Sequence, residues 1–363
     1  MAVNRLNVGA TNQLLAKAST GQSTNILELQ NTAGVTVAGV DASGNGVGGL
    51  FRTSTFKNLI INGGFNIWQR GTSFAATGSV IYGADRWSFF RAALGTGATV
   101  SRQSALLTGF QYSARVQRDS GNTSTEQILA TQVFESVNSI PLAGKNVVYS
   151  FWAKAGANFS GASSAITVSL QIGTGTDQST NTLRFGGWTG QTSLLATTQV
   201  ITTTWTKYQF TATVPSTATQ ISVSLGYNPV GTASTNDWFE ITGVQLEVGS
   251  TATDYEFKPI DVELAQCQRY FQELPIHYGE GTSVNTKRSV VFFSEMRATP
   301  TGTLTIQVFD GSWKSATSTS VSVGKRGGYV SATLSTNYFY VGHGTSQIDG
   351  VFEAGKLRLE IEL

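Results

Sequence analysis

One stretch constrains the fold of this chain most: an apolar run that stops at two glycines and restarts with large aromatic residues. Residues 58–71 read NLIINGGFNIWQRG, and residues 83–87 add GADRW. The pattern predicts a buried strand, a tight turn at the glycines and a second strand. Much later, residues 237–249, DWFEITGVQLEVG, alternate apolar and polar residues as a half-buried strand does. We expect these stretches to form the opening and closing strands of one sheet.

Three motifs in a fixed order carry a family resemblance. They read NLIINGGFNIWQRGTSF with GADRWSF, then ITGVQLEVGSTATDYEFKPIDVELAQCQRYFQE, and then MRATPTGTLT, spread over residues 58 to 304. The chain resembles a family of bacteriophage virion proteins, the tail-fibre or fibre-like proteins. The resemblance implies a jelly-roll β-sandwich similar to carbohydrate-binding modules, carried on a trimeric fibre. It implies neither a known receptor nor a fixed position on the virion.

The composition favours many short strands over a helical enzyme. Of the 363 residues, 40 are glycine, and charged residues make up 13% where roughly 25% is usual. A glycine-rich, charge-poor chain with many aromatic residues suits strands and tight turns. At this length we expect two or three domains in an all-β fold.

Charge and cysteine content argue against several functional classes. The chain has 24 basic and 22 acidic residues with no long run of either, so we expect no nucleic-acid partner. Cys267 is the only cysteine, which rules out an intrachain disulfide and a Cys/His zinc cluster. No apolar run approaches the ~18 residues of a membrane helix, and the N-terminus lacks a signal-peptide pattern. We expect a virion protein that is assembled in the host cytoplasm, without membrane insertion.

Residues 1–50 form a predicted arm. Short patterned pieces at residues 26–30 and 35–40, separated by turn sequences, predict β-hairpins. Because a lone hairpin is marginal in water, we expect the arm to pack against its own copies in a homotrimer, or against the phage tail or capsid protein that anchors it. The alternative is a flexible tail. Residues 44–49, GNGVGG, predict a linker and a domain boundary.

Residues 51–258 carry the pattern of a jelly-roll β-sandwich. Eight candidate strands lie between residues 86 and 247, separated by clusters of Gly, Ser, Thr and Asn. Such spacing is typical of sandwiches and jelly rolls. The stretch from Thr125 to Val137 fits either a strand or a short helix, and periodicity does not decide between them.

Residues 259–275 predict one connecting helix, and residues 276–363 predict a smaller β-domain. The helix is expected from Ile260 to Gln272, capped by Asp261 and ended by Pro275. Its apolar stripe, which packs the cysteine into the core, consists of Ile260, Leu264, Cys267 and Phe271. Because an N-terminal anchor leaves the C-terminal domain furthest from the particle, this domain is the candidate receptor-binding tip.

Catalytic and metal sites have little support in the sequence. A glycosidase needs two carboxylates roughly 5 to 10 Å apart. The acidic residues near the motif strands, which show no spacing signature, are Asp85, Asp237, Glu240, Glu247 and Asp254. His277 and His343 stand beside no Ser or Cys motif, and Asn66 occupies a position where a calcium-binding jelly roll would carry a carboxylate. We predict no catalytic residue, no cofactor and no metal.

Aromatic side chains are the expected sugar-binding groups, because rings stack on the apolar faces of sugars. Trp188 and Trp313 lie between turn signals and are predicted to be exposed. Tyr338 and Tyr340 share one face of a predicted strand at residues 338–341. These four residues are the predicted carbohydrate-binding residues, and burial in a trimer interface is the alternative. The tryptophans predicted to lie in the core are Trp68, Trp87, Trp152 and Trp205.

The patterns and the resemblance predict a structural and adhesive protein rather than an enzyme. We expect a homotrimeric tail-fibre subunit that attaches to the virion by its N-terminal arm and contacts polysaccharide on the host surface. The second interpretation is a capsid-attached head fibre or decoration protein without a dedicated receptor. The third is a tail hydrolase that cleaves polysaccharide.

Overall fold

A computed structural model of the chain contains two compact units, residues 1–57 and 58–363. It describes residues 56–92 and 97–276. Elsewhere it describes three short strands between residues 27 and 48, seven strands between residues 286 and 360, Thr32 and residues 295–297.

The described part of the first unit is a three-stranded antiparallel sheet. Strands β1 (Leu27–Gln30), β2 (Thr36–Val40) and β3 (Gly46–Gly48) pair in that order, and Val40 lies opposite both Leu27 and Gly46. The predicted hairpin strands are confirmed. The linker predicted at residues 44–49 is wrong, because residues 46–48 pair with β2 and glycine does not prevent extended pairing when a partner strand supplies the hydrogen bonds.

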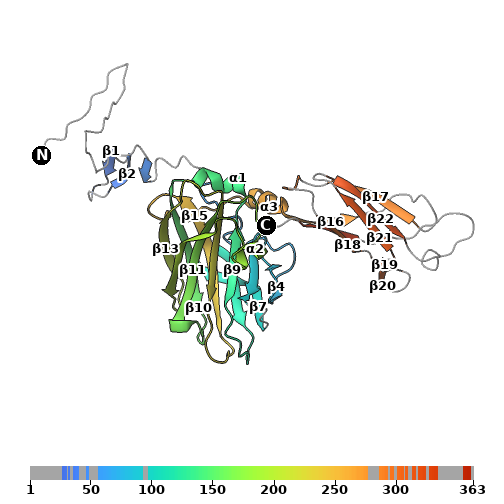
Figure 1. Ribbon diagram of the computed structural model, residues 1–363, viewed down its shortest axis with the longest axis horizontal. Coiled ribbons are helices and arrows are strands. Elements are labelled where there is room, and N and C mark those ends of the chain that lie inside the picture. The colour runs from blue at the N-terminus through green and yellow to red at the C-terminus, as the bar shows by residue number, and fades with distance from the viewer. Residues whose placement is uncertain are drawn as a thin grey trace, which may run out of the picture. The chain divides into compact units, whose positions relative to one another are not determined.

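Most of the second unit is a sandwich of two six-stranded antiparallel sheets (Figure 1). We name them the β10 sheet, in the order β13-β10-β15-β8-β7-β4, and the β11 sheet, in the order β12-β11-β14-β9-β6-β5. The strands are β4 (Ser73–Ala76), β5 (Ile81–Tyr82), β6 (Ser88–Arg91), β7 (Ala98–Leu107), β8 (Phe110–Arg118), β9 (Ile128–Val133), β10 (Asn146–Ala155), β11 (Ala165–Gly173), β12 (Thr192–Val200), β13 (Thr206–Thr213), β14 (Gln220–Tyr227) and β15 (Trp238–Val248). The predicted all-β jelly-roll class is confirmed.

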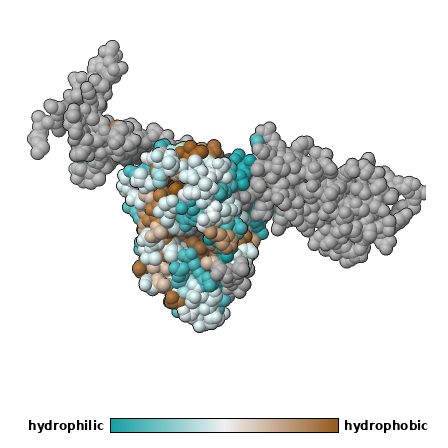
Figure 2. Space-filling model, in the orientation of Figure 1, coloured by the Kyte–Doolittle hydropathy of each residue, from teal (hydrophilic) through white to brown (hydrophobic). Residues whose placement is uncertain are grey.

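Alternation along the strands builds the core. In β11, Ile166, Val168, Leu170 and Ile172 belong to the buried cluster between the sheets, and the residues between them face outward. The outward face of the molecule seen in Figure 2 is mostly pale, the colour of residues near zero hydropathy, with separate brown and teal patches. This matches a chain in which Ser, Thr and Gly take the surface positions that charges fill elsewhere.

The NGGF stretch forms a loop that docks against β15, so the two strands predicted there are wrong. Asn62 is buried, and its amide side chain donates to Ile67 O at 2.8 Å and Asp85 O at 3.1 Å. Gly63 O accepts from Val244 N at 2.9 Å. A Cβ on Gly63 would lie 2.1 Å from Val244 O, which is why this position requires glycine. The predicted strand at residues 237–249 is confirmed as β15.

The helices are short. They are α1 (Ser136–Ser139), α2 (Thr180–Arg184) and α3 (Ile260–Gln268), with 3₁₀ turns at Ile140–Leu142 and Ala162–Ser164. The open question at residues 125–137 resolves as strand β9 followed by α1.

Helix α3 is shorter than predicted. It ends at Gln268, its N-cap residue is Pro259, and no side chain caps it, so the predicted roles of Asp261 and Pro275 are wrong. Phe271–Ile276 form strand β16, which pairs with β23 and takes Pro275 into its ladder. Tertiary pairing therefore outweighs helical periodicity at this end. Cys267 is fully buried, as predicted.

The C-terminal region returns to strands, as the sequence predicts. Sheets β16-β23-β18, β17-β22-β21 and β19-β20 form there. The strands are β17 (Thr286–Phe292), β18 (Thr301–Thr305), β19 (Gln307–Phe309), β20 (Trp313–Ser315), β21 (Ser318–Val323), β22 (Gly327–Thr333) and β23 (Gly355–Glu360). The strand predicted at residues 338–341 lies outside the described residues. The four-part division at residues 50, 258 and 275 stays a prediction.

Within the described residues, no helix has the length and apolarity needed to cross a membrane.

Candidate functional site

Of the four predicted sugar-binding residues, only Trp188 has a described side chain, and it is buried. It is 3% exposed, its indole N–H donates to Ser179 O at 3.0 Å, and it packs with Val133 and Leu183. The prediction of an exposed Trp188 is wrong, because the turn that carries it folds back onto β9. Trp313 lies in β20, and its side chain is outside the described part, as are Tyr338 and Tyr340. The predictions for these three residues stay predictions.

The tryptophans predicted as core divide into two groups. Trp68 and Trp87 are buried, which confirms them. Trp152 and Trp205 are only half-buried, on the outer face of the β10 sheet, and the Lys154 ammonium lies 4.9 Å from the Trp205 ring centroid. In β10 the core residues are those on either side of Trp152, so Trp152 lies on the opposite face of the sheet from the one predicted, and Trp205 lies just before β13.

Four of the five acidic residues near the motif strands bind other groups of the sandwich. Asp85 accepts from Gln69 N at 2.7 Å, and Glu247 accepts from Thr253 N at 2.8 Å. Glu240 is fully buried and binds Arg115 at 2.6 Å. Asp254 is exposed. Among the described residues there is also no group of three or more His, Cys, Asp or Glu that could hold a metal ion.

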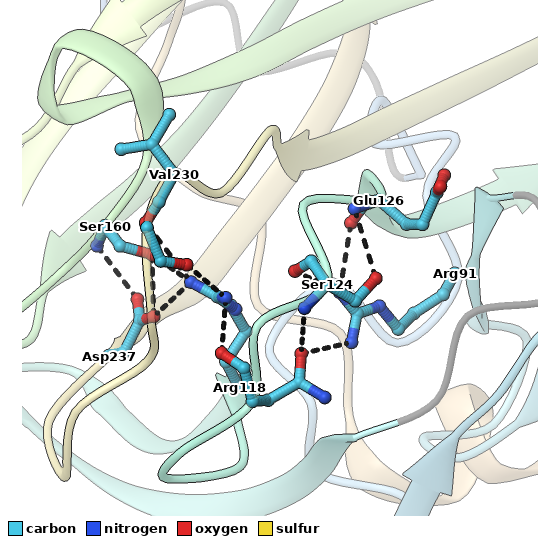
Figure 3. A network of polar contacts seen from close by, with 9 residues as sticks. Arg91, Arg118, Ser124, Glu126, Ser160, Val230 and Asp237 are labelled. Carbon is cyan, nitrogen blue, oxygen red and sulfur yellow. Dashed lines mark hydrogen bonds and ion pairs between the residues drawn. The ribbon is translucent and has the colours of Figure 1, made fainter.

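Asp237 belongs to a buried network that ties loops together (Figure 3). Its carboxylate accepts from Arg118 at 3.1 Å and from the Ser160 hydroxyl at 2.6 Å, and both side chains of the Asp237–Arg118 ion pair are 0% exposed. Arg118 also donates to Asn122 O at 2.6 Å, and Arg91 donates to the Asn122 side chain at 3.0 Å. Each of these hydrogen bonds joins one protein group to another. The network therefore has a structural role.

The candidate site is a groove of about 900 Å³ on the outer face of the β11 sheet. This volume lies within the roughly 300 to 1,000 Å³ typical of ligand pockets. Its lining includes Phe90, Gln127, Thr167, Ser169, Gln171, Arg184, Phe185, Gln191 and Ser224.

The floor of the groove is made by outward-facing residues of neighbouring strands. Thr167, Ser169 and Gln171 alternate with core residues along β11, and Ser224 lies opposite Ser169 on β14. A Cβ on Gly226, which lies opposite Thr167, would lie 2.2 Å from Ile128 O, so this row has a gap instead of a side chain. The result is a floor of hydroxyl and amide groups.

Several of these polar groups retain hydrogen-bonding capacity. Gln191 donates to the Gln171 side-chain oxygen at 2.7 Å, and Gln127 donates to the Thr167 hydroxyl at 3.2 Å. Within the described residues, the Gln171 amide nitrogen and the Ser169 hydroxyl bind no protein group. The floor can therefore both donate to and accept from a ligand rich in hydroxyl groups.

Helix α2 and the residue after it form one wall. Ser179 caps the N-terminus of α2 by accepting from Thr182 N at 3.2 Å, and the helix ends at Arg184. Arg184 and Phe185 at that end project over the groove, and the Phe185 ring is 69% exposed. The Arg184 guanidinium carbon lies 4.9 Å from the Phe185 ring centroid and 5.1 Å from that of Phe90.

Sequence reasoning did not find this groove. An outward row of Ser, Thr and Gln reads as an ordinary solvent-facing side of a strand, and nothing local shows that α2 covers one end of it. The available signal was Arg184-Phe185 before the Gly186-Gly187 pair, a charged and aromatic pair next to a turn.

Known proteins resemble this chain in fold over about half its length. No protein-family model and no curated protein matches the sequence. The enzymatically active domain of tailspike protein 4 of bacteriophage CBA120 is 12% identical over 54% of this chain and 22% of that chain, with a TM-score of 0.34. The C-terminal family 22 carbohydrate-binding module of Clostridium thermocellum Xyn10B is 18% identical over 50% of this chain and 98% of that chain, with a TM-score of 0.30.

An arabinose-bound α-L-arabinofuranosidase is 14% identical over 54% of this chain and 27% of that chain, with a TM-score of 0.32. The match thus spans less than a third of the tailspike and arabinofuranosidase chains. At these scores the likeness concerns the sandwich alone and carries no argument about function.

Proposed function

We propose that the groove on the β11 sheet binds carbohydrate. The observation that carries this proposal is the pairing of a floor of hydroxyl and amide groups with the exposed Phe185 ring at its wall. Sugars combine hydroxyl groups with apolar ring faces, so a polar floor and an aromatic wall match both features. The described lining residues include no Asp or Glu, so they do not offer the two carboxylates of a glycosidase.

Removal of the Phe185 ring tests the proposal. Purified full-length protein and the variant Phe185→Ala are compared on a glycan array and by calorimetry with the best-binding glycan. We expect about fivefold weaker binding, since one stacked ring contributes roughly 1 kcal/mol. Phe257→Ala is the matched control, because Phe257 is similarly exposed at 57% and lies outside the groove lining. Equal binding by all three proteins would overturn the proposal.

We further propose that the chain is a homotrimeric fibre subunit of a phage virion, which uses the groove to hold glycans of the host surface. The ordered motifs between residues 58 and 304 and the paired strands of the N-terminal unit support this role. A head fibre or decoration protein remains the second candidate. Labelling the protein in intact particles and imaging them by cryo-electron microscopy separates a tail position from a capsid position.

A further inference from the structure

The groove contains a single charged side chain. Of its 19 lining residues, only Arg184 is ionisable, and the others are apolar, hydroxyl, amide or glycine residues. A groove that bound its ligand only through neutral hydrogen bonds would not need a guanidinium at its wall. The position and the partners of Arg184 therefore indicate what the groove selects.

Two backbone carbonyl groups hold Arg184 in place. One terminal nitrogen donates to Gly78 O, and the other donates to Arg91 O at 2.9 Å. The guanidinium also lies close to two aromatic rings, those of Phe90 and Phe185. Because a guanidinium has five N–H donors, three remain after these two bonds. The group is thus fixed in position with donors to spare.

Arg184 also lacks the ion-pair partner that Arg115 and Arg118 of the sandwich have. Arg115 binds Glu240 at 2.6 Å and Arg118 binds Asp237 at 3.1 Å. No carboxylate of the described residues lies within ion-pair distance of Arg184. Burial lowers the pKa of Arg184 from its ordinary value, and no neighbouring acid raises it again. Among the described residues, therefore, no acid compensates the positive charge at the wall.

We propose that the groove binds an acidic glycan, whose carboxylate accepts from the free N–H groups of Arg184 while an adjacent sugar ring lies on Phe185. This inference rests on the proposed function, that the groove binds carbohydrate. A planar guanidinium matches a carboxylate with two parallel hydrogen bonds, which are stronger than bonds between neutral groups. The remaining hydroxyl groups of the glycan then bind the floor at Gln171 and Ser169.

The test compares carboxylated and neutral polymers. Full-length protein is titrated with polygalacturonate, alginate and hyaluronan, and with dextran, xylan and galactan. The best carboxylated polymer is then tested again after chemical reduction of its carboxyl groups, which leaves the backbone intact. We expect carboxylated polymers to bind more tightly, reduction to remove the preference, and binding to weaken as salt is raised.

Two substitutions test whether Arg184 causes the preference for carboxylated polymers. Arg184→Gln should weaken binding of the carboxylated polymer about tenfold to a hundredfold, the range for hydrogen bonds to charged groups, and leave neutral polymers unchanged. Arg184→Lys keeps the charge without the planar fork. Its affinity for the carboxylated polymer should lie between that of the unchanged protein and that of Arg184→Gln. The control is Lys207→Gln, which removes an equal charge from the other sheet, at β13. Circular dichroism confirms that each variant is folded.

The outcomes separate the two proposals. If neutral polymers bind as tightly as carboxylated ones and Phe185→Ala weakens both, the acidic-glycan inference is overturned while carbohydrate binding stands. If no polymer binds, or Phe185→Ala has no effect, both are overturned. If Arg184→Gln and Lys207→Gln reduce binding equally, the preference comes from net charge and the role of Arg184 is overturned.

Discussion

Replacing Gly63 with alanine tests whether the NGGF loop is fixed by its contact with β15. The added Cβ would lie 2.1 Å from Val244 O and 3.2 Å from the Ile60 side chain. The first contact is with backbone inside the central ladder, so it cannot be relieved by a rotamer change. The loop must move away from β15, which also lengthens the hydrogen bond from Val244 N to Gly63 O, now 2.9 Å.

The expected cost follows from these two effects. Overpacking a tight interior costs roughly 1 to 3 kcal/mol, and a weakened buried hydrogen bond adds about 1 kcal/mol. We therefore expect Gly63→Ala to lower the free energy of unfolding by about 3 kcal/mol. For a domain of this size the melting temperature should fall by roughly 6 to 12 °C. Urea titration and differential scanning calorimetry measure both quantities.

Gly64→Ala is the matched control for this prediction. A Cβ at Gly64 would meet only the ends of side chains, Asn66 Nδ2 at 3.2 Å and the Tyr255 hydroxyl at 3.3 Å. These groups can shift by a few tenths of an ångström, so we expect a loss below about 1 kcal/mol. Equal losses for the two variants, or an unchanged melting temperature for Gly63→Ala, would refute the proposed contact.

Three further predictions concern the network, a buried phenol and assembly. Asp237→Asn leaves the buried Arg118 without a counter-charge and should lower the free energy of unfolding by roughly 3 to 5 kcal/mol, measured by urea titration. The control is Asn236→Asp, which changes the charge at the neighbouring position and should not cause this loss. Burial first, and then the Glu135 carboxylate, raise the pKa of Tyr270 to about 12. The protonated phenol therefore stabilises the folded protein below pH 10, and this contribution to the free energy of unfolding is lost as pH rises through about 12. Tyr270→Phe should remove that part of the pH dependence, measured by phenolate absorbance and melting temperature. Sedimentation should give three chains of 38.6 kDa per particle, and a variant lacking residues 1–50 should fold but be absent from purified virions.

Sequence patterns predicted the sandwich because its strands alternate. The inward residues of β10 and β11 recur every second position, and turn residues separate the strands, so both the class and most strands followed from local information. The failures occur where distant contacts decide. Phe271 continued a helical stripe but pairs with Glu360 in a sheet, and no local pattern shows that pairing.

Exposure was harder to predict than secondary structure. Trp188 lies among glycines, yet its loop folds back and buries it against Val133 and Leu183. Trp152 lies within strand β10, yet it faces outward. Which face of a sheet is covered depends on the packing of whole elements, and residue patterns report only that two faces exist.

The groove and the motifs also differ in what they specify. Asn62, Gly63 and Asp85, which belong to the motifs behind the fibre resemblance, bind backbone groups of the loop and β15. Arg184 and Phe185, which form the groove wall, lie outside every motif. The motifs therefore position the scaffold, whereas the residues that line the groove lie on strand faces and at a helix end. If the groove binds a glycan as we propose, a chain could keep all three motifs and bind a different glycan by changing only the wall and the floor.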